Sequence, residues 1–324
     1  NGRCAIIAEG EDAGIFTSIK RVTVGVCDDG SCHTACGTAE DFRSIIEDEA
    51  VVKYGYDLKL QRNILSHNGI NLRGRLMDIE LMHYLINPEK SHKVEILAKS
   101  YLDINLEECL PEKKEEAPLS LFDEAPEEEA ASDERFPEAV ATLQLGDAIW
   151  KEMEEADLCG LYERMEEPLL AVLSDMEMEG VKIDLPQLRK YASALAAEMN
   201  DIQERVREMA EEPALNIMSP KQVGILLYEK MNLDPKVKMK GAMRNYPTDE
   251  DTLNALADKH PIINEILEYR GVKKLLSTYI EPLPSYISPV TGKIHTTFNQ
   301  ALTATGRLSS SKPNLQNIPI RTER

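Results

Sequence analysis

The sequence predicts an α/β domain followed by a mainly α-helical region. Over residues 1–102, short apolar strands alternate with helical patterns, the order that an α/β domain shows. Farther along, residues 188–209 and 262–279 carry apolar side chains at every third or fourth position, as amphipathic helices do. The 324 residues are enough for two domains with separate hydrophobic cores.

The first 102 residues contain both the strand pattern and the helix pattern of apolar residues. An alternating or continuous apolar pattern of four to eight residues indicates a strand, and apolar spacing of three to four indicates a helix. Strands are expected at 4–9, 21–27, 31–35 and 51–54. Helices are expected at 39–49, 58–66, 78–85 and 94–101.

Six cysteines raise the question of a metal site or of disulfides. Cys27, Cys32, His33 and Cys36 lie close together, but their spacing fits no CxxC pair, and the segment has the pattern of a strand hairpin turning around Asp28–Gly30. No secretory signal is visible, so reduced thiols are the expected state. No metal site is predicted here.

The net charge of −20 would argue against a nucleic-acid partner if it were spread evenly. Residues 103–138 hold fourteen acidic and three basic residues, a local net of −11, together with four prolines, and are expected to be a disordered insertion. Residues 213–324 hold ten acidic and fifteen basic residues, a local net of +5. The basic C-terminal third can therefore attract a polyanion although the whole chain is acidic.

The helical region is expected to begin in residues 139–157 and to continue to Met178. After an extended piece at 180–183, Asp184 is expected to cap a long helix that has Pro186 in its first turn. The two long striped helices are expected to pair antiparallel. Between them, Ser219 and Thr248 each begin a pattern typical of a helix N-cap.

Residues 303–321 (TATGRLSSSKPNLQNIPIR) combine one arginine after a glycine with several amide side chains. Amides both donate and accept hydrogen bonds, and the minor groove presents the same acceptors for A·T and T·A pairs. Such a surface can hold a correct base pair without reading its sequence. The alternative is an ordinary polar loop with a proline-bounded turn.

This segment closely resembles the start of the palm in family A DNA polymerases of the bacterial DNA polymerase I type. The resemblance is strongest at 161–183, at 216–226 and at 269–321, which includes this segment, and it is weaker at 53–65 and 78–86. The resemblance implies a fragment with a ribonuclease-H-like 3′–5′ exonuclease domain, a thumb and the first strands of the palm. The implied limits are 1–157, 158–293 and 294–324.

The resemblance also implies residues that contact primer–template DNA. Those along the duplex backbone would be Asn216, Ser219, Lys221, Gln222, Arg270, Lys273 and Lys274. Those in the minor groove at the primer terminus would be Asn299, Thr303, Arg307, Asn314, Gln316 and Asn317. The structural alternatives are simple helix capping for Ser219 and a solvated helix face for Arg270, Lys273 and Lys274.

The family's exonuclease motifs are altered in this chain. The first carboxylate pair falls on Glu9 and Glu11, the second motif has Asp57 and Gln61 in place of its asparagine and aspartate, and the third falls on Glu134 and Glu138. A glutamine amide is a poor ligand for a hard divalent ion. A vestigial, inactive exonuclease-like domain is therefore expected, with Asp78 as a helix cap and not a ligand.

In this family the polymerase carboxylates that hold Mg²⁺ follow the LQNIP segment, beyond Arg324. The resemblance therefore implies a polymerase of replication and repair that uses Mg²⁺ and deoxynucleoside triphosphates when intact, while this chain alone is expected to bind no metal and not to polymerise. An active proofreading exonuclease with substituted acids and a non-catalytic duplex-binding module are the alternatives. A cytoplasmic, nucleoid-associated monomer that binds no membrane is expected.

Overall fold

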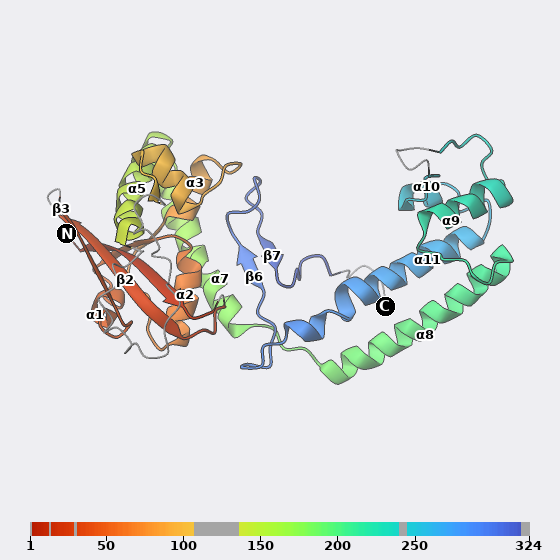
Figure 1. Ribbon diagram of the computed structural model, residues 1–324, viewed down its shortest axis with the longest axis horizontal. Helices are drawn as coiled ribbons and strands as arrows, with labels where there is room; N and C mark the ends of the chain where they lie inside the picture. Colours follow the sequence, from red (N-terminus) through yellow and green to blue (C-terminus); the bar gives the residue numbers. More distant parts are fainter. Residues whose placement is uncertain (1, 13, 29–30, 107–135, 240–244, 319–324) are drawn as a thin grey trace, which may run out of the picture. The chain divides into compact units, whose positions relative to one another are not determined.

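The computed structural model describes residues 2–12, 14–28, 31–106, 136–239 and 245–318 (Figure 1). Packing divides the chain into two compact units, Asn1–Gly180 with His295–Gln316, and Val181–Ile294 with Asn317–Arg324. These units need not coincide with the domain limits expected at 157 and 293, which stay predictions. The disordered insertion expected at 103–138 lies largely outside the described residues.

A five-stranded mixed sheet forms the centre of the first unit. In spatial order the strands are β3 (Ser31–Gly37), β2 (Ile19–Asp28), β1 (Arg3–Gly10), β4 (Val52–Gly55) and β5 (Leu76–Asp78). The first three pair antiparallel as a meander, and β1, β4 and β5 run parallel. The buried run Cys4–Ala8 in β1 shows that the central strand is covered on both faces.

Helix α5 (Phe136–Glu155) packs across β1, β2, β3 and β4. Gly146 of this helix lies against the ring of Tyr54, where an added Cβ would come within 2.3 Å of a ring carbon. A glycine at this position therefore lets the helix approach β4 closely.

The remaining helices of the first unit complete its core. They are α1 (Arg43–Ile46), α2 (Leu58–His67), α3 (Ile79–Ile86), α4 (Val94–Leu97) with the π-helical η1 (Ala98–Leu102), α6 (Cys159–Leu161), the π-helical η3 (Tyr162–Glu166) and α7 (Glu167–Glu179). Tyr162 is fully buried, and its hydroxyl donates to Leu76 O and accepts from the Asp78 amide, each at 2.8 Å. These two hydrogen bonds connect η3 to strand β5.

The last elements of the first unit are β6 (Thr297–Asn299) and β7 (Ser309–Ser311), an antiparallel pair. They come more than one hundred residues after α7 along the chain, yet they pack with the first unit. The residues between β6 and β7 include Thr303 and Arg307.

Two long helices dominate the second unit (Figure 1). Asp184 caps α8 (Leu185–Ala210), which has Pro186 in its first turn as predicted, and its 26 residues span about 39 Å at 1.5 Å per residue. Helix α11 (Ile262–Lys274) continues as π-helical η5 (Leu275–Ile280). Hydrogen bonds join Arg205 to Glu265 and Tyr269 to Gln203, so residue numbers run in opposite directions and the predicted antiparallel pairing is confirmed.

Short elements fill the region between the long helices. They are α9 (Pro220–Gly224), η4 (Ile225–Lys230), α10 (Glu250–Asn254) and the 3₁₀ turn η6 (Leu283–Tyr286). The cap expected at Thr248 is one residue off: Asp249 caps α10, because its carboxylate accepts from the Thr252 amide at 3.0 Å. In the first unit, the helix expected at 39–49 is reduced to α1, because Thr38–Phe42 form a turn closed by Asp41 and Thr38.

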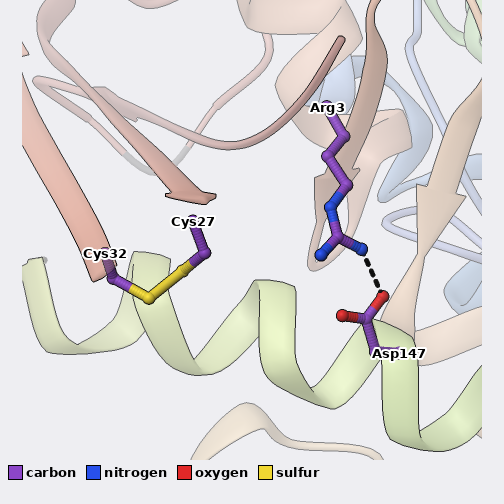
Figure 2. Close-up of a disulfide and its surroundings, with 4 residues drawn as sticks. All are labelled: Arg3, Cys27, Cys32 and Asp147. Atoms are coloured by element: carbon purple, nitrogen blue, oxygen red, sulfur yellow. Dashed lines mark hydrogen bonds and ion pairs between the residues drawn. A yellow bond between two sulfur atoms is a disulfide. The ribbon is translucent and has the colours of Figure 1, made fainter. Parts of the chain in front are cut away.

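The hairpin expected around residues 28–30 is present, but the expectation of reduced thiols is wrong for two cysteines. Strands β2 and β3 place Cys27 directly opposite Cys32, with a Cα–Cα distance of 4.1 Å, and the two sulfurs form a disulfide. Figure 2 shows this bond together with the ion pair between Arg3 of β1 and Asp147 of α5. The cross-strand register brings the two thiols together, which sequence spacing alone did not indicate.

Replacing both Cys27 and Cys32 by serine should lower the free energy of unfolding by about 2 kcal/mol, the entropic effect of a loop this short. Urea unfolding of the first unit would measure the change. Cys36→Ser, on the exposed face of the same hairpin, is the matched control and should have less than about 0.5 kcal/mol of effect. Alkylation of Cys27 and Cys32 without prior reduction would contradict the disulfide.

Candidate nucleic-acid interface

The loop between β6 and β7 places the predicted minor-groove residues of the first unit on one hairpin. The Thr303 hydroxyl donates to Arg307 O at 2.7 Å, which closes the loop, and Gly306 adopts a positive φ of 73° within it. The Arg307 side chain is exposed and makes no hydrogen bond or ion pair to another described residue. Its guanidinium is therefore available to an external acceptor.

The predicted amide residues help to build this hairpin. The Asn299 amide donates to the hydroxyls of Ser309 (3.3 Å) and Ser311 (3.2 Å), and Gln316 donates to Leu308 O at 3.1 Å. Asn314 accepts from the Gln316 amide N–H at 3.1 Å. Part of their hydrogen-bonding capacity thus shapes the loop, although Asn314 and Gln316 remain exposed. Asn317 is also exposed and falls in the second unit.

In the second unit, the predicted backbone contacts gather at the start of α9. Ser219 is the N-cap and accepts from the Gln222 amide N–H at 3.4 Å, as predicted. The Gln222 side chain does not complete a capping box, because it accepts from the Asn216 amide at 2.8 Å. Asn216, Lys221 and Gln222 are exposed, so this turn presents amide and ammonium groups to solvent.

Arg270 does not lie on a solvated face of α11. Its guanidinium is half-buried and donates to Thr248 O at 2.5 Å and to Ile217 O at 3.4 Å. Burial lowers the pKa of this group. The arginine thus connects α11 to the segments that precede α9 and α10. Lys273 is partly buried and Lys274 is exposed near the end of the same helix.

The predicted exonuclease positions fall at the ends of β1 and β4 and on α5. Glu9 forms an ion pair with Arg21, and Glu11 is exposed. Asp57 caps α2 in a left-handed conformation (φ 46°) and accepts from the Leu60 amide at 3.2 Å. Glu138 lies in the first turn of α5, and Glu134 lies outside the described residues.

Gln61 is buried and serves a structural role. Its carbonyl oxygen accepts from the Ala8 amide at 3.1 Å and its amide donates to Tyr56 O at 2.8 Å. It therefore joins α2 to the end of β1 and to the loop after β4.

A cavity of about 150 Å³ lies beside these positions. Its lining includes Asp57, Lys59, Asp78, Glu80 and the segment 297–302. Asp78 caps α3, as predicted, and its oxygens accept from the amides of Leu58, Glu80 and Leu81.

The pKa values of two acidic groups that line this cavity are raised. Burial raises the pKa of Asp78 well above its usual range, and burial with the charge of Asp57 raises the pKa of Glu80 to about 7. Within the described ranges, no group of three or more His, Cys, Asp or Glu side chains has an arrangement that could hold a metal ion.

Comparison with known proteins identifies the relatives of this chain. Residues 185–324 match the family model "DNA polymerase family A", and residues 32–108 match "DNA polymerase I, ribonuclease H-like domain". DNA polymerase I of Bacillus subtilis (strain 168) is 40% identical over 288 residues, covering 88% of this chain and 32% of that protein. The chain belongs to the family A DNA polymerases.

Other similar proteins are also DNA polymerases of this type. The thermostable DNA polymerase I of Thermus aquaticus is 44% identical over 175 residues, which cover 54% of this chain and 21% of that protein. A solved structure described as the POL domain of Pol1 from M. smegmatis in complex with DNA primer-template and dNTP aligns with a TM-score of 0.81 and 30% identity, over 100% of this chain and 53% of that chain. This family A chain spans about a third of the length of the curated DNA polymerase I relatives first matched.

The family match confirms the predicted fold class. The mixed sheet is the ribonuclease-H-like domain of a family A polymerase, and a mainly helical polymerase region follows it. None of the helices in the described ranges has the length and apolar character needed to cross a membrane.

Sequence reasoning about this family A chain missed one buried polar centre. Glu177 is only 3% exposed and lies on the face of α7 that also carries Leu170 and Leu173. The sequence did contain a signal, because Glu177 follows Leu170 and Leu173 at helical spacing. A carboxylate on the apolar face of a helix needs buried hydrogen-bond partners.

Arg270→Ala should destabilise the segments that precede α9 and α10, because the carbonyls of Ile217 and Thr248 lose a charged donor. Hydrogen bonds to charged groups contribute about 2 kcal/mol, so amide exchange around 217–226 should accelerate roughly 30-fold if it proceeds by local opening. Lys274→Ala, one turn farther along and exposed, is the control. Equal exchange in the two variants would contradict the role of Arg270.

Proposed function

We propose that this chain is the duplex-binding part of a DNA polymerase I that acts in replication and repair. In this proposal the second unit contacts the duplex backbone and the β6–β7 hairpin contacts the minor groove at the primer terminus. The observation that carries the proposal is Arg307, an exposed guanidinium without a protein partner among the described residues, in a loop shaped by amide side chains.

Charge supports this assignment. Residues 213–324 have a net charge of +5 although the chain as a whole has −20. Lys221 and Lys274 are exposed, and Lys221 lies in the first turn of α9. Phosphate oxygens are suitable ligands for such groups, and these contacts carry no sequence preference.

The M. smegmatis structure supports the nature of the partner, since its description names a DNA primer-template and a dNTP as bound molecules. For this chain, primer–template DNA is the proposed partner. Deoxynucleoside triphosphates and Mg²⁺ are proposed for the intact polymerase, whose metal-binding carboxylates we place after Arg324. The chain alone is proposed to be non-polymerising, monomeric and cytoplasmic in a bacterial nucleoid.

We further propose that the ribonuclease-H-like domain is catalytically inactive. Two-metal phosphodiester hydrolysis needs several carboxylates around a shared pair of ions. Here Glu9 is paired with Arg21, Asp57 caps a helix, and Gln61 offers a neutral amide that already bonds Ala8 and Tyr56. These contacts leave the former catalytic positions in structural roles.

The inactive-domain proposal predicts no Mg²⁺-dependent 3′–5′ degradation of a labelled single strand above the level of a Glu9→Ala/Asp57→Ala double variant. Denaturing electrophoresis after repeated purification would measure it. Degradation that persists through repurification and disappears in the double variant would overturn the proposal in favour of an active proofreading exonuclease.

In the intact polymerase, Arg307→Ala should reduce nucleotide incorporation roughly 100-fold, the order of loss that follows removal of one hydrogen-bond donor from an active site. Duplex affinity should fall by less than about tenfold, since many backbone contacts remain. Single-turnover primer extension and fluorescence anisotropy would separate the two effects. The charge-matched control is Lys20→Ala, an exposed residue on β2. An unchanged extension rate would remove Arg307 from the primer site.

A further inference from the structure

We propose that helix α2 of the ribonuclease-H-like domain has a positioning function. Through the buried Glu177 of α7 it fixes strand β6 and so orients the loop that carries Arg307. The consequence for DNA binding rests on the proposed function above. The positioning itself concerns only contacts within the first unit. Glu177 acts through the hairpin and is not itself placed against DNA.

Glu177 connects three segments through one carboxylate and one carbonyl. One carboxylate oxygen accepts from the Lys59 ammonium and from the Phe298 amide at 2.8 Å, and the other accepts from the Asn63 side chain at 2.7 Å. The Glu177 carbonyl oxygen contacts the His295 ring Nδ1 at 2.6 Å. Helix α2 thus contacts the start of the hairpin segment through α7.

Two side chains of α2, Lys59 and Asn63, bind the Glu177 carboxylate. Lys59 and Asn63 are four residues apart, so they project from the same face of the helix, and both are buried. The Asn63 side-chain oxygen also accepts a hydrogen bond from the Ser174 hydroxyl at 2.5 Å. Ser174 lies one helical turn before Glu177 on α7. A buried carboxylate with an ammonium, an amide and a backbone N–H as donors has its hydrogen-bonding capacity satisfied.

Two further contacts extend the attachment along the loop. The Gln300 amide donates to Glu166 O at 3.0 Å, and the Tyr84 hydroxyl donates to Thr303 O at 2.6 Å. Thr303 in turn donates to Arg307 O. Protein contacts therefore hold the backbone at Phe298 and Thr303 and the side chain of Gln300. The hydrogen bond from Thr303 then leads to Arg307.

The hairpin needs such external support. Strands β6 and β7 have three residues each, and among the residues that the structure describes they pair only with each other. An isolated two-stranded ribbon is at most marginally stable in water. Without the contacts to α2, α3 and η3, the loop would sample many orientations, and Arg307 would have to be ordered by the DNA itself.

Glu177→Gln keeps the size of the side chain and removes its charge. Hydrogen exchange across 297–311 should then accelerate at least about tenfold, while exchange in α8 and α11 stays unchanged. Asp175→Asn is the matched control. Asp175 lies on the same helix, its side chain is exposed and it forms an ion pair with Arg62, so the hairpin should stay protected in this variant. Unchanged protection of 297–311 in Glu177→Gln would overturn the proposal.

A double-mutant cycle distinguishes positioning from general stability. Glu177→Gln should weaken binding of a primer–template duplex about five- to tenfold, but less than about twofold when Arg307 is already alanine. With Lys221→Ala, in the other unit, the two losses should multiply. Full multiplication of the Glu177 and Arg307 effects would show that Glu177 does not act through the hairpin.

Two further variants keep the proposal testable if Glu177→Gln folds poorly. Lys59→Met/Glu177→Gln removes both charges of the buried pair and should restore much of the protection. Tyr84→Phe deletes only the hydroxyl that binds Thr303 and should loosen 303–307 more than 297–299; no change there would contradict the attachment. If the unaltered chain binds no duplex, the proposed function fails, and exchange alone decides whether Glu177 positions the hairpin.

Discussion

The first unit depends on a carboxylate buried between helices and a hairpin. Moving an ionised carboxylate out of water costs several kcal/mol, and its partners must offset that cost with good geometry. Glu177 meets this requirement with donors from Lys59, Asn63 and the Phe298 amide. Removal of one partner from a buried pair typically costs about 3–5 kcal/mol, so these segments cannot separate without a large penalty. This constraint explains how a hairpin far along the chain is retained by an N-terminal helix.

Local rules predicted much of this molecule because local contacts determine those parts. Asp184 and Ser219 cap helices as expected, since a cap depends on the next three residues. The α8–α11 pairing followed from two apolar stripes. Contacts between distant residues were not predictable in the same way: the Cys27–Cys32 bond depends on strand register, and Arg270 depends on where two separate turns place their carbonyls. Residue types drew attention to the segment 303–321, but they did not indicate the β6–β7 hairpin or its attachment through Tyr84 and Glu177.

Gln61 shows why a neutral amide suits its buried position. A carboxylate there could accept from the Ala8 amide, but an ionised carboxylate has no proton to donate to Tyr56 O. The neutral amide satisfies both backbone groups at once. Substitutions that improve structure at the expense of a charged active centre are a common form of the trade-off between stability and activity. The proposed loss of nuclease activity is therefore compatible with the structural contacts that Gln61 makes from α2.

The division of hydrogen bonds within the β6–β7 hairpin bears on how it would meet DNA. Asn299 and Gln316 already use donors to hold neighbouring strand and loop atoms, so these side chains arrive with restricted rotamers. Arg307 has no such restraint, and an arginine side chain loses up to about 2 kcal/mol of conformational entropy when it is fixed. Most of the ordering of this loop is thus completed in folding, and ordering on contact is confined mainly to one guanidinium. A preformed backbone with one adjustable donor gives tight placement of a base pair while keeping the entropic cost of each binding event small.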